Sequence, residues 1–413
     1  MKTLQVISVI RNILTFMLMF YSIYQVVFWF LAYIKPIKKK KITNKKHKFM
    51  AIVSARNEEK VISNLIESLK NQHYPKNKLD IYVIADNCTD NTAQIAREAG
   101  AIVYERFDET KKSKGYALEW FFDKVLEEFP DKYDAFCVFD ADNIVAPSFI
   151  NKMNEKLCEG EQIVQGYRDI KNPGDNWLSA NGAFYFWMLN RLYHYSRYKL
   201  GLSSFIQGTG FMVSMDIIKE EGGWHTTALT EDIEFSFTQI AKGRKIAWAN
   251  DAVLYDEQPI KLAQIWNQRL RWGVGNIQVM KKCIPMLLKS KKVTPIIIDS
   301  FIYLMSLPVL FISIISALFN FIQMTALPMN EIFTQLGSQL VMSMIFIMGS
   351  ILQVVIVLKL DKKNLKQVWH GILTYPIFLG ITYAVNACAV FNTNMTWKPI
   401  EHVRVVKISE LQK

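Results

Sequence analysis

Two acidic residues follow a short apolar segment in the sequence Val138-Phe139-Asp140-Ala141-Asp142. The apolar run 135–139 predicts a buried strand, and two carboxylates at its end are costly unless a partner neutralises them. Mg²⁺ or Mn²⁺ would be such a partner, because hard divalent cations bind carboxylate and diphosphate oxygens together. Such a metal stabilises charge on a departing diphosphate. Asp140 and Asp142 are therefore predicted to bind a metal ion, and Asp140 the donor diphosphate, although a D-x-D pattern by itself often occurs by chance.

A second acidic group, Thr230-Glu231-Asp232, follows the turn-forming sequence Gly222-Gly223-Trp224-His225. A hydroxyl group that attacks a sugar must lose its proton, and a carboxylate held near the reaction centre can accept it. Asp232 is the expected general base, with Thr230 and Glu231 as its catalytic neighbours. The alternative is that these three residues only cap the start of a helix.

A third group is Gln268-Arg269-Leu270-Arg271-Trp272, in which Gln268, Arg271 and Trp272 would share one face of a helix. A guanidinium group can hold a diphosphate, and an indole ring can stack on a sugar. Gln268 and Arg271 are therefore expected to bind the donor, and Trp272 the acceptor.

Three further polar segments stand where apolar segments end and helices are expected to begin. Backbone N–H groups at a helix start suit a nucleotide, which makes Asn57 and Glu58 candidate donor-binding residues. The Asp86 carboxylate could accept a hydrogen bond from the N3–H of uracil, and Lys114, beside a glycine, could approach a pyrophosphate. For each segment the alternative is an ordinary helix cap or a solvated charge.

The elements that must position these residues are short apolar strands that alternate with amphipathic helices between Phe49 and Trp272. This alternation predicts an α/β domain with a mainly parallel sheet that is covered by helices on both faces. Ligands of such domains bind at the carboxyl ends of the strands, which is where the polar residues above fall. The expected strands are 49–55, 81–85, 102–104 and 135–139, and the expected helices include 61–70 and 92–99.

Apolar segments of membrane-spanning length flank this domain. The first, within residues 1–34, lacks a cleavage site, so a retained anchor is expected rather than a signal peptide. Eight lysines in the linker 35–48 indicate that the next domain lies in the cytosol, near anionic lipid headgroups. The expected organisation is an N-terminal transmembrane helix (1–34), a basic linker (35–48), the catalytic domain (49–272), an amphipathic interface helix (273–294), a transmembrane region of about three spans (295–391) and a C-terminal tail (392–413).

The side of the membrane on which the tail lies is ambiguous. The apolar segments after the catalytic domain are 295–323, 336–358 and 372–391. The connection 359–366 carries four lysines and is expected in the cytosol, whereas 324–338 carries none and is expected outside. Four simple passes would then place the tail outside, although it carries several basic residues. Either one segment does not cross or the charge rule fails, and the tail motif 396–402 either closes over the catalytic face or anchors at the interface.

Composition narrows the functional classes. The net charge of +12 includes the lysine-rich linker beside an apolar segment, and the sequence holds no nucleic-acid-binding module, so nucleic acid is not an expected partner. The five cysteines are scattered, which argues against a zinc cluster or disulfide framework and suits a reducing compartment. A transporter would need ionisable residues inside its spans, and Asp299 is the only acid well within an apolar segment.

Taken together and in this order, the D-x-D, T-E-D and Q-x-x-R-W elements resemble the processive branch of glycosyltransferase family 2. That branch includes the cellulose, hyaluronan, chitin and poly-N-acetylglucosamine synthases. The similarity runs from about Phe49 to Trp272 and extends to the flanking apolar segments. It implies a GT-A fold, here inserted between transmembrane helices, with inversion at the anomeric carbon and a UDP-sugar donor.

The resemblance also implies roles for individual residues. The family's metal and diphosphate motif falls on the D-x-D acids, its general base on Asp232 and its uracil-side acid on Asp86. Its diphosphate and acceptor motif falls on the Q-x-x-R-W residues. The segment Gly208-Thr209-Gly210 resembles the loop that faces the acceptor sugar, which adds Gly208 and Thr209 to the acceptor-binding candidates.

The sequence therefore predicts an inverting membrane glycosyltransferase that polymerises a β-linked polysaccharide, of glucan or poly-N-acetylglucosamine type, from UDP-glucose or UDP-N-acetylglucosamine. A plasma-membrane location with a cytosolic catalytic domain would let the growing polysaccharide pass outward between the spans as it lengthens. About four spans are few for a polar polymer to cross by, so a second copy or an accessory export protein is a further expected partner. The alternative is a non-processive transferase that adds one sugar to a polyprenyl phosphate or another lipid acceptor.

Overall fold

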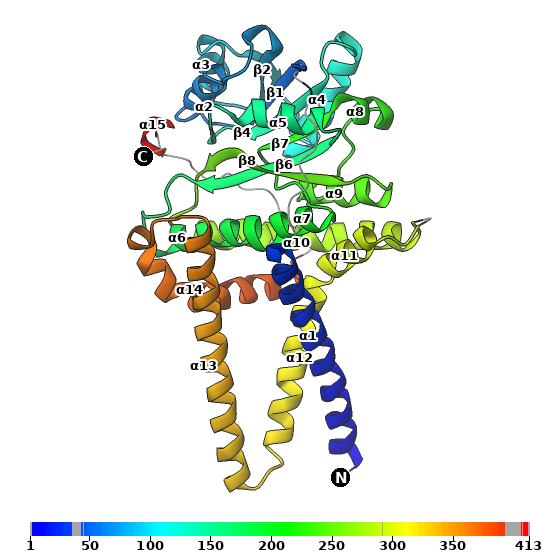
Figure 1. Cartoon of the computed structure of the whole chain (residues 1–413), viewed down its shortest axis with the longest axis vertical. Helices are drawn as coiled ribbons and strands as arrows, with labels where there is room; N and C mark the ends of the chain where they lie inside the picture. The colour runs from blue at the N-terminus through cyan, green and yellow to red at the C-terminus, as the bar shows by residue number, and fades with distance from the viewer. Residues whose placement is uncertain are drawn as a thin grey trace.

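The computed structural model describes residues 2–34, 43, 45–290, 292–392, 406 and 408–411. Figure 1 shows a catalytic domain built on a sheet and a layer of helices beneath it. The helices that extend away from this layer are α1 (Lys2–Ile34), α12 (Ser306–Met324) and α13 (Met329–Leu360). Most of the linker 35–44 and most of the tail, including the motif 396–402, lie outside the described residues.

The centre of the catalytic domain is an eight-stranded sheet. Its strands are β1 (Phe49–Ala55), β2 (Leu79–Asp86), β3 (Ile102–Arg106), β4 (Ala135–Asp140), β5 (Ile144–Val145), β6 (Ile163–Ile170), β7 (Phe211–Ser214) and β8 (Ile246–Asp256). They lie in the order β3-β2-β1-β4-β7-β6-β8-β5. β1 is parallel to β2 and β4, β2 to β3, and β6 to β8, whereas β7 is antiparallel to both its neighbours and β5 to β8. The expected α/β architecture with a mainly parallel sheet is confirmed.

Both faces of the sheet are covered by helices, and successive residues of a strand enter two different hydrophobic cores. In β1, Met50 and Ile52 belong to one core, and Ala51 and Val53 belong to the other. Because both faces are buried, the strand reads as an uninterrupted apolar run in the sequence. The helices of the first core include α4 (Lys114–Glu128), α8 (Met215–Glu221) and α9 (Glu231–Ala241), and those of the second are α2 (Ile62–Lys70), α3 (Thr92–Glu98) and α5 (Phe149–Cys158).

The helix layer beneath the sheet is drawn from distant parts of the chain (Figure 1). Its members are α6 (Trp177–Met188), the π-helix η2 (Leu189–Tyr195), α7 (Ser196–Leu200), α10 (Leu262–Leu288), α11 (Pro295–Leu304) and α14 (Leu365–Ala389). Within the layer α14 packs against both α6 and α10. This layer connects the sheet to the long helices.

The helix that carries the Q-x-x-R-W sequence is longer than expected. α10 continues to Leu288, so the boundary expected at 272/273 falls inside one helix and the interface helix 273–294 is not a separate element. Gly273 and Gly275 lower helix propensity, but each lies where a Cβ would come within 2.7 Å of another element, Ala389 of α14 or Thr230 respectively. Close packing therefore keeps the helix continuous through both glycines.

The apolar segment expected as 295–323 forms two helices, α11 and α12, that meet at Met305. Pro308 has no N–H to donate to the carbonyl of Leu304, which explains a break at this point. Among the described residues, α12, α13, α14 and residues 5–31 of α1 are long and apolar enough to cross a membrane.

α14 differs from the other long helices in direction. Figure 1 shows it lying across the underside of α6 and α10 rather than alongside α13. Gly371 permits this close approach, because a Cβ there would lie 2.5 Å from Ala180 of α6. The turn before α14 is fixed to the catalytic domain, since Arg191 Nε donates to Asp361 Oδ1 at 2.6 Å and Lys363 Nζ donates to an Asp169 oxygen at 2.6 Å. α14 therefore begins and stays beside the catalytic domain.

Candidate active site

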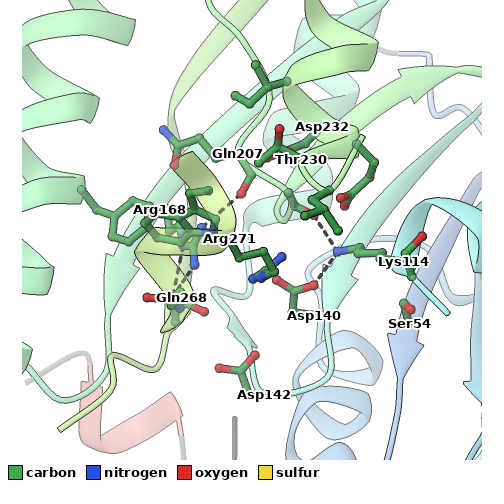
Figure 2. A pocket seen from close by; sticks show the side chains of 18 of the residues that line it. Ser54, Lys114, Asp140, Asp142, Arg168, Gln207, Thr230, Asp232, Gln268 and Arg271 are labelled. Carbon is green, nitrogen blue, oxygen red and sulfur yellow. Dashed lines mark hydrogen bonds and ion pairs between the residues drawn. The ribbon is translucent and has the colours of Figure 1, made fainter. Parts of the chain in front are cut away.

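A pocket of about 280 Å³ extends from the carboxyl ends of β1, β2 and β4 into the helix layer (Figure 2). Asp86 and Asp140 line it at the strand ends, and Tyr303 of α11 lines it in the helix layer. Most residues singled out from the sequence meet here. Those that line the pocket are Glu58, Asp86, Lys114, Asp140, Asp142, Gly208, Thr230, Glu231, Asp232, Gln268, Arg271 and Trp272.

Asn57 and Thr209 are not among the residues that line this pocket. Asn57 Oδ1 accepts a hydrogen bond from the N–H of Thr89 at 2.8 Å, which joins the loop after β1 to the loop after β2. Thr209 is fully buried, and its Oγ1 accepts from the N–H of Asp140 at 3.1 Å. Polar side chains in such loops satisfy the backbone groups of the loops themselves, so neither residue presents its side chain to the pocket.

The first end of the pocket holds Asp86, which is 5% exposed. Arg106 Nη1 donates to Asp86 Oδ1 at 2.6 Å, and Asn87 Nδ2 donates to the same oxygen at 3.0 Å. Burial raises the pKa of Asp86, while the hydrogen bond from Arg106 opposes the rise. Ser54 and Arg56, at the carboxyl end of β1, also line this end of the pocket, although the sequence analysis did not select them. The carboxylate is held in one orientation and can accept from the N–H of a base.

The two D-x-D acids are held by a network beneath the loop that carries them. The N–H of Asp140 donates to Asn143 Oδ1 at 3.2 Å, and Asn143 Nδ2 donates to Asp142 Oδ1 at 3.3 Å. Asp142 Oδ2 accepts from the N–H of Glu257 at 3.3 Å, and the carbonyl of Asp142 accepts from Lys171 Nζ at 2.6 Å. These bonds fix the loop, so that both carboxylates line the pocket.

Arg168 and Asp256 form a buried ion pair behind this loop, with Arg168 Nη2 2.6 Å from Asp256 Oδ2. Asp256 Oδ1 also accepts from Asn143 Nδ2 at 3.0 Å, which links the pair to the D-x-D loop. Burial raises the pKa of Asp256 to about 6, and the Arg168 charge opposes the rise. The sequence reasoning missed both residues. The available signal was the acidic pair Asp256-Glu257 at the end of β8, after the apolar residues 252–255.

Lys114 connects Asp140, one of the two D-x-D acids, to the loop at Gly208 that is expected to face the acceptor. Its Nζ forms an ion pair with Asp140 and donates to the carbonyl of Gly208 at 2.6 Å (Figure 2). Gly208 has a φ of +78°, and a Cβ at this position would lie 3.3 Å from Asp232 Oδ2. Glycine therefore suits both the backbone conformation and the narrow space above the Asp232 carboxylate.

Glu231 and Asp232 begin α9 as a neighbouring pair of half-buried carboxylates. Burial and the neighbouring Asp232 raise the pKa of Glu231 to about 7, and Lys114 and Arg271 oppose the rise. Burial also raises the pKa of Asp232, against the effect of the Ile233 N–H and the same two cations. A carboxylate with a raised pKa is a stronger base than one in water, which suits proton transfer near neutral pH. Thr230 packs against Gly275 of α10 and so sets the start of α9.

α10 presents Gln268, Arg271, Trp272 and Asn276 to the pocket, as expected for helical spacing. In Figure 2 the Arg271 side chain extends toward Asp140. The Trp272 ring stacks on Tyr185 with centroids 6.0 Å apart and planes at 27°. The intervening Arg269 points away and lies over the rings of Tyr185 and Phe378, at 4.7 and 4.6 Å.

The end of the pocket in the helix layer is aromatic and apolar. It is lined by Tyr185 and Phe186 of α6, Leu189 of η2, Phe205, Ile233 of α9 and Tyr303 of α11. Tyr185 and Phe186 reach the pocket from the edge of a hydrophobic core that also contains Trp187, which does not line the pocket. The sequence did not predict Phe205 or Tyr303 as lining residues, because both lie in segments with the pattern of ordinary core residues.

The chemistry of the donor set is consistent with a divalent metal bound together with a ligand. Asp140 and Asp142 supply carboxylate oxygens, which Mg²⁺ and Mn²⁺ prefer. In the part of the chain that the structure describes, no group of three or more His, Cys, Asp or Glu side chains is arranged to hold a metal ion. A metal at the D-x-D acids would therefore need further oxygen ligands from a bound diphosphate and from water.

Residues 47–275, which contain the sheet and most of the residues that line this pocket, match the family described as glycosyltransferase like family 2. The chain belongs to this family. Its sheet and helix layer also resemble a mannosyltransferase of Pyrobaculum calidifontis, solved in complex with GDP-Man and Mn²⁺, with a TM-score of 0.65 at 15% sequence identity. That likeness covers 94% of this chain and 98% of the other, and it establishes the GT-A fold expected from the sequence.

Several curated relatives are similar in sequence to this glycosyltransferase. A probable glycosyltransferase of Bacillus subtilis is 28% identical over 65% of this chain and 64% of its own length. A beta-monoglucosyldiacylglycerol synthase of Nostoc is 27% identical over 63% of this chain and 55% of its own length. The chain thus spans less than two thirds of these relatives. A poly-beta-1,6-N-acetyl-D-glucosamine synthase of Staphylococcus epidermidis is 23% identical over 92% of this chain and 93% of its own length.

Proposed function

We propose that this glycosyltransferase transfers a hexose from UDP-glucose or UDP-N-acetylglucosamine to a hydroxyl group, with inversion, and repeats the step to build a β-linked polysaccharide. The observation that carries the proposal is the composition of one pocket. The cations Lys114 and Arg271 and the carboxylates of Asp140 and Asp142 line the same cavity as the half-buried carboxylate of Asp232. The cavity then continues past Trp272 into the helix layer, where an acceptor would lie.

On the donor side, the Asp86 carboxylate accepts from the base N–H, in the orientation fixed by Arg106. Lys114 and Arg271 bind the diphosphate oxygens, and Gln268 adds an amide donor. Asp140 and Asp142 would hold Mg²⁺ or Mn²⁺ together with the diphosphate, and that metal would stabilise the leaving-group charge. The pairing of Lys114 with Asp140 supports this geometry, because it brings the cation within reach of any diphosphate held at the D-x-D loop.

On the acceptor side, Asp232 takes the proton of the attacking hydroxyl group. The hydroxyl oxygen bonds to the anomeric carbon as the bond from that carbon to the diphosphate oxygen breaks, which inverts the configuration. Glu231 keeps the pKa of the carboxylate pair raised, and Gly208 leaves space above Asp232 for the acceptor. The Trp272 ring, backed by Tyr185, offers a face on which a sugar ring can stack.

Polymerisation is favoured over a single transfer by the extent of similarity. The poly-N-acetylglucosamine synthase aligns along 92% of this chain and 93% of its own length, well beyond the catalytic domain alone. A lipid acceptor is the second candidate. It is favoured by the apolar lining at the far end of the pocket, where Leu189, Phe205 and Ile233 would contact an alkyl chain. The similarity to the glucosyldiacylglycerol synthase covers 63% of this chain.

We also propose that the protein crosses the plasma membrane with α1, α12 and α13, and that α14 lies at the cytosolic interface. Arg191 and Asp361 support this topology, since they bind the turn between α13 and α14 to the catalytic domain. Three crossings would put the catalytic domain and the tail on the same side, which resolves the conflict between four passes and a basic tail. So few crossing helices enclose little space, so a second copy or an export partner would complete a path for the polymer.

The test is a donor panel with product sizing. Membranes containing the protein are incubated with labelled UDP-glucose, UDP-N-acetylglucosamine or GDP-mannose and either Mg²⁺ or Mn²⁺. We expect one UDP-sugar to enter a product of many sugars that a glycosidase degrades. A product of one sugar in the lipid extract would support the lipid acceptor instead, and transfer from GDP-mannose alone would refute the proposed donor.

A further inference from the structure

Arg197 of α7 and Asp299 of α11 form an ion pair outside the catalytic pocket. Their side chains are 1% and 3% exposed, and Arg197 Nη2 lies 3.3 Å from Asp299 Oδ1. Two charges removed from water are costly, and a buried pair is weak evidence of added stability. A specific arrangement of the helices is the better-supported reason for keeping such a pair.

The N-terminal helix completes this cluster. Tyr24 of α1 donates its O–H to Asp299 Oδ1 at 2.8 Å, and Arg197 Nη2 donates to Gln25 Oε1 at 2.8 Å. The Arg197 guanidinium also lies 5.1 Å from the ring centroid of Phe28. Three segments that are far apart in the sequence thus meet at one ion pair, and Figure 1 shows α1 reaching the helix layer beside α7 and α11.

The cluster lies one helical turn from the aromatic end of the pocket. Tyr303 follows Asp299 by four residues on α11, and Tyr193 precedes Arg197 by four residues. The rings of Tyr193 and Tyr303 are 5.0 Å apart, and Tyr303 is 4.7 Å from Phe205. Tyr303 and Phe205 both line the pocket. Movement of α11 relative to α7 would therefore reshape the acceptor end.

We propose that Arg197 and Asp299 are positioning residues that lock α1, α7 and α11 together, so that Tyr303 holds the acceptor toward Asp232. This inference rests on the proposed function for the meaning of the aromatic end as the acceptor site. Most donor residues lie at the strand ends and on α4, and only Gln268 and Arg271 lie on α10, which packs against α11. The lock therefore acts chiefly on the acceptor.

The experiment measures how a labelled sugar is divided between product and water. Asp299→Asn keeps the size of the side chain but removes its charge. The UDP-sugar that the wild type uses is supplied, and both transfer and release of free sugar are counted. We expect transfer to fall about tenfold while release to water and UDP affinity stay within about twofold, because displacement of one reactant by about 1 Å can cost about 100-fold. Tyr24→Phe removes only the hydrogen bond to Asp299, so it should lower the share of labelled sugar that reaches product by a smaller amount.

Asp361→Asn is the matched control. Asp361 is also a buried acid that binds an arginine of the catalytic domain, but its partner is Arg191 and it fixes the turn before α14. It should lower stability without changing the division between product and water. Equal division in Asp299→Asn and wild type, or the same change in Asp361→Asn, would refute the positioning role.

A second measurement separates this inference from the proposed function. Hydrogen exchange of the backbone amides in 297–304 should quicken in Asp299→Asn and stay unchanged in Asp361→Asn. If the wild type transferred neither UDP-sugar, the proposed function would fail, and faster exchange confined to Asp299→Asn would still support the lock. Unchanged exchange in Asp299→Asn would overturn the lock whatever the activity.

Discussion

The two ends of the pocket are built in different ways. At the strand end, the charged side chains of Asp86, Lys114 and Asp140 stand at the last residue of a strand or the first residue of a helix, and each has a charged or hydrogen-bonding partner. At the helix-layer end, Tyr185 and Tyr303 present rings that contact other rings, and the ion pair of Arg197 with Asp299 lies outside the pocket. The donor end thus depends on charge, and the acceptor end depends on shape. Substitutions should separate the two ends, with the largest effects where charge is lost.

Metal removal should have the largest effect, because it acts on the donor end and on the departing diphosphate. Excess EDTA should reduce transfer to the background, and Mg²⁺ or Mn²⁺ should restore it. Asp142→Asn should give the same loss with metal present, while Asp131→Asn, an exposed acid on the surface, should not. Full transfer in EDTA would remove the metal from the proposed mechanism.

Asp232 lies between the two ends, so its loss should affect the chemical step and spare the donor. Asp232→Asn should lower the transfer rate by about 10²–10⁴-fold, the usual contribution of a positioned general base. UDP affinity should change little, as measured by titration calorimetry, because the donor site lies on Lys114 and Arg271. Asp251→Asn, at an exposed position, is the control. Lower UDP affinity with an unchanged transfer rate would assign Asp232 to the donor end.

The donor end could be predicted from the sequence because its signals are local. An apolar run followed by acids, as at Val138–Asp142, defines both a strand and the functional group at its end. The same reasoning found Asp86, Lys114 and Asp232. It also selected Asn57 and Thr209, whose side chains bond to backbone groups of the loops, because the sequence does not reveal whether a polar loop residue faces the ligand or the loop's own backbone.

The acceptor end and the membrane arrangement could not be predicted in this way. Tyr303 lies in an apolar helix, and its place in the pocket depends on contacts with η2 and α9 that no local pattern encodes. Arg168 and Asp256 support the D-x-D loop from strands that meet it only in the folded sheet. The direction of α14 depends on Gly371 and its contact with α6. A hydropathy profile gives the length and apolarity of a segment, and it does not give the direction in which the helix runs relative to its neighbours.

Trp272 should show a smaller effect that is confined to the acceptor end. Trp272→Ala should keep UDP affinity, shorten the products and lower transfer about tenfold, since an aromatic contact is worth about 0.5–1.5 kcal/mol beyond its buried area. Gel filtration of labelled product would give the chain length. Trp369→Ala, on an exposed face of α14, should leave length and rate unchanged. If Trp272→Ala weakened UDP binding and left product length unchanged, α10 would serve only the donor end.

The pH dependence should show the smallest effect, and it tests the boundary between the two ends. Burial and the neighbouring carboxylate raise the pKa of Glu231 to about 7, so the pair takes up a proton as the pH falls through that value. Transfer needs the pair unprotonated, and kcat/KM reports the free enzyme, so kcat/KM should fall below about pH 7. Two interacting carboxylates share this titration.

Glu231→Gln removes the repulsion between the two carboxylates, which should lower the pKa of Asp232 and move the acidic limb of the pH profile down by about one pH unit. Glu119→Gln, outside the pocket, should leave the limb in place. If the acidic limb of the pH profile does not move in Glu231→Gln, Asp232 titrates independently of its neighbour. The charge interactions of the donor end would then not extend to the general base.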